Sequence, residues 1–215
     1  MKVTCVLGSP RKKGFSATVA REFLSELRKK GETQIREFHL NSLSYRGCQA
    51  CYRCNQDLDR CALTDDLNEV LEEVRTTDLL VISSSVFYGD VTGQTKTFID
   101  RMYSFVRYDF EKEEFTSRLA NKSLLMILTQ GNSDSNLFND IYPRYSFFFS
   151  VGGFSDIRLI RGCGLNPVPG ALETSDVLEQ AREAARYFGN SLEKAKKEPT
   201  NIKPISLESL SRNSA

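Results

Sequence analysis

The chain has 215 residues, with 29 basic and 28 acidic side chains and a formal net charge of +1. A chain of this length can bury a substantial core, and one α/β domain is the natural expectation. Because neither sign of charge dominates, the composition gives no field that would recruit nucleic acid or an anionic membrane, and a small ligand or a protein partner is expected instead. The first apolar stretch, residues 3–7, is short and is followed by GSPR, which fits neither a signal peptide nor a spanning helix and predicts a cytoplasmic location.

Short apolar strands alternate with amphipathic helices along the chain. Strands are expected at residues 2–7, 33–40, 79–82, 124–129 and 157–160, and helices at about residues 16–28, 67–74, 94–105 and 177–188. Thr64, Asp65 and Asp66 precede the second helix and are expected to cap it. Apolar strands joined by helices are typical of a parallel sheet covered on both faces, so the sequence predicts an α/β fold with a doubly wound, five-stranded parallel sheet.

One domain is expected over residues 1–193, with a cysteine-rich excursion at residues 47–62 after the second strand. Residues 194–215 contain Lys, Pro, Ser and Asn and are expected to form a C-terminal tail. Such a tail is either disordered, as chain ends often are, or docked on a neighbouring subunit through its apolar side chains, Ile202, Ile205, Leu207 and Leu210.

Four cysteines, Cys48, Cys51, Cys54 and Cys61, lie within fourteen residues in the run GCQACYRCNQDLDRC. A C-x2-C-x2-C repeat followed by a fourth thiol can close thiolates around a compact iron–sulfur cluster of the [4Fe–4S] type. Zinc binding and redox-active disulfides remain alternatives on spacing alone, and chance clustering of structural thiols is the weakest one. Cys5, inside the first strand, is expected in the core, and Cys163, between two glycines, is expected in a turn.

The loop that follows the first strand, residues 8–18, is a candidate phosphate site. In an open parallel sheet, ligands bind beyond the carboxyl ends of the strands. The hydroxyls of Ser9, Ser16 and Thr18, the guanidinium of Arg11 and the amides of a helix N-terminus can hold one phosphate there. An ordinary polar turn with a helix cap explains the same residues. Neither a P-loop nor a dinucleotide fingerprint fits the spacing of Gly8 and Gly14.

Two further loops follow the third and fourth strands. The first offers the aromatic side chains Phe87 and Tyr88 beside Gly89, and the second, TQGNS from Thr129, offers backbone amides and carbonyls. Each loop alone is equally well explained as a polar turn. Together with the phosphate loop they predict FMN, because a flat heteroaromatic ring and a monophosphate are what this cofactor presents.

These motifs resemble the flavodoxin-like NADPH-dependent FMN reductases, and specifically their iron–sulfur flavoprotein branch. The resemblance covers residues 1 to about 188 and rests on GSPRKKGFSATVA, the cysteine run followed by CALTDDL, SSVFYGDVTGQTKTFIDR and TQGN. It implies the following sites: Ser9, Arg11, Ser16 and Thr18, with Ala17 in the same turn, at the FMN phosphate; Val86, Phe87, Tyr88, Gly89, Asp90, Thr129, Gln130 and Gly131 around the isoalloxazine; and Cys48, Cys51, Cys54 and Cys61 as ligands of [4Fe–4S]. Ser85 stands where the family usually has proline, and Ser16 where it often has asparagine.

The resemblance also implies a homodimer or homotetramer in which the cluster of one subunit approaches the flavin of another. Subunit contact would explain the aromatic residues Tyr142, Tyr145 and Phe147 to Phe149, and core burial explains them equally well. No partner histidine exists for His39, which is expected to be structural, and Asp100 and Arg101 are expected to form a pair on a helix face.

Three functions fit the sequence. The first is an electron-transfer flavoprotein that takes electrons from a ferredoxin-like carrier and passes them through the cluster and FMN to a small-molecule acceptor such as dioxygen, peroxide or a quinone. In this case Tyr88 and Asp90 would tune the flavin. The second is an NAD(P)H-dependent reductase of FMN or quinones without a cluster. The third is a flavodoxin-fold interaction module whose cysteines bind zinc.

Overall fold

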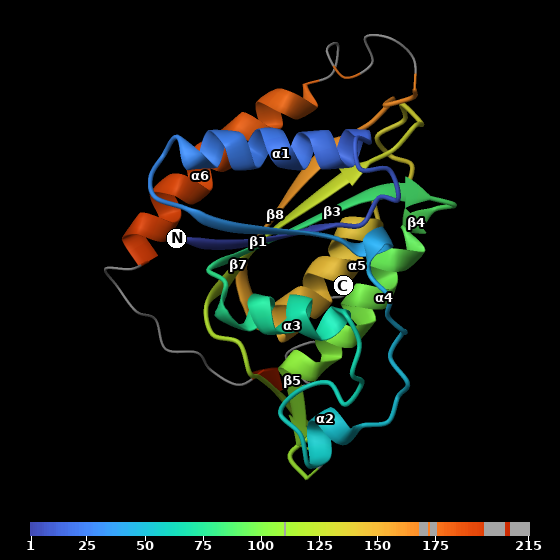
Figure 1. Ribbon diagram of the computed structural model, residues 1–215, viewed down its shortest axis with the longest axis vertical. Helices are drawn as coiled ribbons and strands as arrows, with labels where there is room; N and C mark the ends of the chain where they lie inside the picture. The colour runs from blue at the N-terminus through green and yellow to red at the C-terminus, as the bar shows by residue number, and fades with distance from the viewer. Residues whose placement is uncertain (110, 168–171, 173–175, 196–204, 207–215) are drawn as a thin grey trace.

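The computed structural model describes residues 1–109, 111–167, 172, 176–195 and 205–206. A parallel sheet crosses the molecule with the strand order β2-β1-β3-β7-β8 (Figure 1). These strands are β1 (Lys2–Leu7), β2 (Gln34–His39), β3 (Leu79–Phe87), β7 (Lys122–Thr129) and β8 (Phe154–Gly162), and β4 (Asp90–Val91) pairs antiparallel with the end of β3. This order is that of the flavodoxin-like fold, so the predicted fold class is confirmed.

Helices cover both faces of the sheet. Two of them, α1 (Phe15–Arg28) and α6 (Val177–Ala195), lie on one face, and α3 (Leu67–Thr76), α4 (Gly93–Arg101) and α5 (Ile141–Val151) lie on the other (Figure 1). Alternate residues of the central strands point into the two resulting cores: Cys5 and Leu7 pack against α1 and α6, whereas Val6 and Ile82 pack toward α3 and α4. Cys5 is therefore a core residue, as expected.

Several elements differ in extent from the predictions. Strand β3 continues through Phe87, because Ser83 to Ser85 pair in register with Ile127 to Thr129 of β7. The expected helix at 94–105 divides into α4 and a 3-10 turn, η2 (Met102–Phe105). Of the three expected capping residues of α3, Asp65 accepts the Leu67 N–H at 3.2 Å, whereas Asp66 makes no capping hydrogen bond.

A small antiparallel sheet was not predicted from the sequence. It consists of β5 (Val106–Asp109), β6 (Glu114–Ser117) and β9 (Ile205–Ser206). Ile205 pairs with Phe115 and Ser206 with Glu114, so this short part of the tail pairs with a strand of the same subunit. The other apolar tail residues named above, Ile202, Leu207 and Leu210, lie outside the described residues.

The aromatic segment forms α5, and its side chains divide between buried and exposed positions. Tyr145 and Phe149 are buried, whereas Phe147 and Phe148 are exposed. The exposed pair lines an apolar groove of about 600 Å³ between α5, α4 and β6. No helix in the described part of the chain is long and apolar enough to cross a bilayer.

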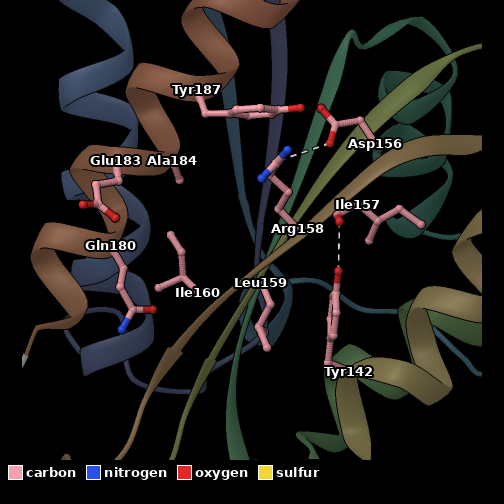
Figure 2. A pocket seen from close by; sticks show the side chains of 10 residues that line it. All are labelled: Tyr142, Asp156, Ile157, Arg158, Leu159, Ile160, Gln180, Glu183, Ala184 and Tyr187. Atoms are coloured by element: carbon pink, nitrogen blue, oxygen red, sulfur yellow. Dashed lines mark hydrogen bonds and ion pairs between the residues drawn. The ribbon is translucent and has the colours of Figure 1, made fainter.

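The outer edge of β8 carries polar caps from two helices. The Tyr142 hydroxyl donates to the Ile157 carbonyl at 2.9 Å. The Gln180 side-chain amide accepts the Arg161 N–H at 3.2 Å and donates to the Arg161 carbonyl at 3.3 Å. Figure 2 shows the groove of about 580 Å³ beside this edge, in which the Arg158 guanidinium lies 3.3 Å from the centre of the Tyr187 ring.

Candidate functional site

The first two candidate loops meet at the carboxyl edge of the sheet. The Gly8 N–H donates to the Ser83 carbonyl at 2.7 Å, and the Ser83 hydroxyl donates to the Ser16 carbonyl at 2.8 Å. Thr92, which caps α4, donates its hydroxyl to the Gly8 carbonyl at 2.7 Å. The turn before α1 is therefore fixed to the end of β3 and to the start of α4.

The phosphate loop leaves two groups available for an anion. The hydroxyl oxygen of Ser16 is fully buried and has no hydrogen-bond partner in the described part of the chain. Arg11 is exposed, and no described hydrogen bond or ion pair engages its guanidinium. The first turn of α1 contains no acidic residue, so the positive end of this helix is not neutralised locally. An unpartnered buried hydroxyl and a free guanidinium in one loop fit a phosphate group.

The remaining phosphate-loop residues shape the turn. Ser9 is buried, and its Oγ accepts the Arg11 N–H at 3.3 Å, which leaves the Ser9 hydroxyl proton free to donate. Thr18 donates its hydroxyl back to the Gly14 carbonyl at 3.2 Å. Ala17 is buried in the core beneath the turn.

The hairpin between β3 and β4 presents an aromatic tip at the same edge. Val86 and Phe87 end β3, Tyr88 is fully exposed, and both Tyr88 (φ 50°) and Gly89 (φ 90°) have left-handed backbone conformations. The side chain of Asp90 turns away from this tip. Its carboxylate accepts hydrogen bonds from the Tyr145 hydroxyl at 3.0 Å and from the Arg144 guanidinium at 3.2 Å, so it attaches the hairpin to α5.

Arg161 of β8 holds the third loop in place through hydrogen bonds, and it was not identified from the sequence. Its guanidinium donates to the side-chain oxygen of Gln130 at 2.7 Å and to the carbonyls of Ser135, at 2.7 Å, and Leu137. Gln130 is buried, and its own amide donates to the carbonyls of Asn132 and Asp134.

Because the Gln130 backbone N–H and carbonyl are also bonded, to Gly162 and Leu165, Gln130 acts as an internal brace. Thr129 is buried at the end of β7, and Gly131 is exposed at the start of the loop. Phe138, at the far end of the loop, lies against Gly89 of the hairpin: a Cβ on Gly89 would be 3.6 Å from its ring. The second and third loops are thus in contact.

The cysteine segment, residues 47–62, lies apart from this edge. It descends beside α4 to the short helix α2 (Arg53–Gln56), which lies against β5 (Figure 1). Cys48 and Cys51 are exposed, Cys54 is buried and Cys61 is half-buried. Among the described residues, no three His, Cys, Asp or Glu side chains are gathered in a metal-binding arrangement.

Arginine side chains fix the backbone of the cysteine segment. Arg118 donates to the Cys54 carbonyl at 2.6 Å, Arg101 donates to the Arg46 carbonyl at 2.9 Å, and Arg75 donates to the Asp59 carbonyl. Burial, and then the nearby Cys61, raises the pKa of the Cys54 thiol, which Arg118 partly offsets. A segment of four thiols that is held by the buried Arg101 and the half-buried Arg118 suits an anionic, thiolate-bound cluster in its chemistry. In this conformation the four sulfur atoms do not come together around one point.

The other ionisable residues considered in the sequence have structural partners. The Nδ1 atom of His39 lies 3.0 Å from the Ser42 hydroxyl. The expected pair of Asp100 with Arg101 is wrong: Asp100 pairs with Lys96, and Arg101 is buried against Asp65. Neighbouring residues on a helix do not face each other, which explains this error. Cys163 is half-buried and directly follows β8, outside any helix or strand.

Comparison with known proteins identifies relatives of this chain. An iron–sulfur flavoprotein of Methanocaldococcus jannaschii is 26% identical over 204 residues, which cover 92% of this chain and 100% of that protein. An iron–sulfur flavoprotein of Archaeoglobus fulgidus is 35% identical over 105 residues, 49% of this chain and 47% of the relative. The alignment thus spans about half the length of this second relative.

Solved structures with the same fold include an FMN-dependent NADH-azoreductase from Bacillus anthracis in complex with FMN. It has a TM-score of 0.68 and 16% identity, and the alignment covers 88% of this chain and 99% of that one. An NAD(P)H:quinone oxidoreductase from Methanothermobacter marburgensis gives a TM-score of 0.68 at 18% identity, over 86% and 98% of the two chains.

The family model described as NADPH-dependent FMN reductase matches residues 1–139. This match covers more than half of the 215 residues and confirms the family expected from the sequence motifs. The chain belongs to the NADPH-dependent FMN reductase family, a family of flavin-dependent oxidoreductases, and within it resembles the iron–sulfur flavoproteins.

Proposed function

We propose that this chain is an electron-transfer flavoprotein that binds FMN at the carboxyl edge of the sheet and a [4Fe–4S] cluster in the cysteine segment. The observation that carries the proposal is the unpartnered buried hydroxyl of Ser16, in the same loop as a free Arg11, at the point where the flavodoxin-like fold places its ligand. A chain with this phosphate loop and four closely spaced cysteines would combine two redox centres.

The flavin assignment is supported by how the edge is built. Ser16, Ser9 and Arg11 would hold the phosphate, and the tip of the β3–β4 hairpin with Gly131 would border the ring. Asp90 and Gln130 would act indirectly, since their side chains hold these loops in place. The azoreductase with the same fold was solved in complex with FMN.

The cluster assignment is supported by the thiol spacing, by the names of the relatives, by the buried guanidinium of Arg101 and by the half-buried guanidinium of Arg118. When bound, such a cluster moves one electron at a time, whereas FMN accepts one or two, so together they convert single-electron input into two-electron reduction. We further propose a ferredoxin-like donor, a small-molecule acceptor such as dioxygen, peroxide or a quinone, and a homodimer or homotetramer that brings the two centres together.

A second function is favoured by two specific observations. The described cysteines do not form a metal-binding arrangement, and a 24% identical relative over 80% of this chain, from Pseudoalteromonas atlantica, is named an FMN-dependent NADH:quinone oxidoreductase. On this alternative the chain takes a hydride from NAD(P)H and reduces quinones or FMN without a cluster.

Anaerobic purification with counts of iron, sulfide, zinc and FMN per chain separates these functions. Iron and sulfide near four each with one FMN supports the proposal, whereas FMN alone with NAD(P)H oxidation supports the alternative. Zinc without flavin would indicate the interaction module instead. Replacing Cys54 by Ala should remove the cluster but retain FMN, and Arg11→Ala should weaken FMN binding while iron stays. The reverse pattern would contradict the assignment of the two sites.

A further inference from the structure

Arg101, the last residue of α4, has a completely buried side chain. A buried guanidinium is strongly unfavourable unless its charge and its N–H groups are satisfied. Its placement beneath the cysteine segment therefore requires specific partners, and those partners show what the residue does.

The partners of Arg101 come from both ends of the cysteine segment. Its Nη1 donates to the Arg46 carbonyl and to Asp65 Oδ2, both at 2.9 Å. Its Nη2 donates to Asp65 Oδ1 at 3.2 Å and to Asn68 Oδ1 at 3.3 Å. Asp65 in turn accepts the Arg46 N–H at 3.2 Å. Arg46 lies two residues before Cys48 and Asp65 four residues after Cys61, so one ion pair closes the segment into a loop.

One donor of Arg101 remains unused. The Nε atom is buried and has no hydrogen-bond partner in the described part of the chain. A buried donor without a partner is destabilising, so its retention needs a reason. Burial acts to lower the pKa of Arg101, but the hydrogen bond with Asp65 and then the interaction with Cys61 raise it above its usual value.

We propose that Arg101 is a positioning residue for the cluster: it closes the cysteine segment through Asp65 and Arg46, and its free Nε–H donates to the sulfur of Cys61 when the cluster is bound. The inference rests on the proposed cluster. A donor on a ligating sulfur stabilises the more negative, reduced state and so raises the reduction potential. Closure of the loop slows the loss of iron.

Arg101→Lys tests both the closure of the segment and the donation to Cys61, because lysine keeps the positive charge but lacks the paired Nη donors and the Nε donor of the guanidinium. Arg75→Lys is the matched control, since Arg75 also donates to a carbonyl of the segment but does not join its ends. The readouts, on anaerobic holoprotein, are the midpoint potential of the cluster from a redox titration followed by electron paramagnetic resonance, and the rate of iron loss to a chelator.

In Arg101→Lys we expect the one-electron equilibrium of the cluster to shift about tenfold toward the oxidised state, which lowers its midpoint potential by about 59 mV. We also expect the variant to lose iron at least about tenfold faster than wild type, with its FMN content unchanged. Wild-type values in this variant, or equal changes in Arg75→Lys, would overturn the inference while leaving the cluster itself established. A wild-type protein without iron and sulfide overturns both proposals.

If Arg101→Lys does not fold, Asp65→Asn removes the ion pair with Arg101 and weakens the closure of the segment without changing Arg101 itself. Faster iron loss from that variant than from wild type supports the closure, and an unchanged rate refutes it.

Discussion

Replacing Gly8 by alanine should disrupt the junction of the first two flavin loops. A Cβ at this position would lie 1.7 Å from the Thr95 hydroxyl oxygen and 3.1 Å from the Ser83 carbonyl oxygen. Favourable contacts between heavy atoms begin at ~3.5 Å, so one of these groups must move. The backbone of Ser83 is fixed in the sheet, and the Thr95 hydroxyl is held 2.9 Å from the Thr92 hydroxyl.

The cost follows from these two contacts. Overpacking in a close-packed site costs about 1–3 kcal/mol, and losing the hydroxyl hydrogen bond costs about 1 kcal/mol. We therefore expect Gly8→Ala to lower the free energy of unfolding by about 2–4 kcal/mol and, because the adjoining turn carries Ser9 and Arg11, to weaken FMN binding at least about tenfold.

Denaturant unfolding and fluorescence titration with FMN measure the two effects. Gly93→Ala is the control, since a Cβ there has nothing within 4 Å and alanine favours the helix that Gly93 begins. Adding Thr95→Ala to Gly8→Ala removes the colliding hydroxyl and should recover part of the stability, which a double-mutant cycle isolates. If Gly8→Ala unfolds and binds FMN like Gly93→Ala, the reasoning is wrong.

Two further predictions concern residues outside the loops themselves. Arg161→Ala removes the donors that hold Gln130 and the rest of the third loop, so FMN affinity should fall at least about tenfold while iron content is unchanged; an unaltered Kd in the flavin titration would contradict this role. Burial raises the pKa of Tyr45 to about 12, so its contribution to stability is complete below pH ~10 and is lost as the pH rises toward the folded value. Between pH ~10 and the folded pKa, the free energy of unfolding of Tyr45→Phe should therefore fall less steeply with pH than that of wild type, as measured by denaturant unfolding at a series of pH values. The same pH dependence in both proteins would show that Tyr45 is not the group responsible.

The order of the elements was readable because the central strands are continuous apolar runs, whereas their lengths were not. Ser83 and Ser84 look like loop residues, yet both are fully buried in β3. Their hydroxyls are satisfied by backbone groups, the Ser16 carbonyl and the Thr92 N–H, and this compensation comes from distant parts of the chain. The β5–β6 hairpin escaped notice because its two strands are only four residues each and are joined by a largely charged turn, so the apolar face formed by Val106, Tyr108 and Phe115 is too short a pattern to recognise.

For the candidate site, the sequence predicted which loops come together but not how their side chains are used. Asp90 and Gln130 seemed available for a ligand, and both are held by arginines from β8 and α5 that no spacing rule connects to them. Arg101 was misread for the same reason, since its partners lie 33 to 55 positions earlier in the chain. The long-range partners of arginine side chains are the information that a single sequence lacks.

The outer edge of β8, whose backbone groups are hydrogen-bonded to Tyr142 and Gln180, limits how copies of this protein can associate. Extension of a sheet by a strand from another molecule needs a free row of backbone donors and acceptors. Here the Tyr142 phenol and the Gln180 carboxamide already satisfy three of these groups, and an incoming strand would have to displace both side chains. Edge-to-edge polymerisation is thereby disfavoured at this end of the sheet.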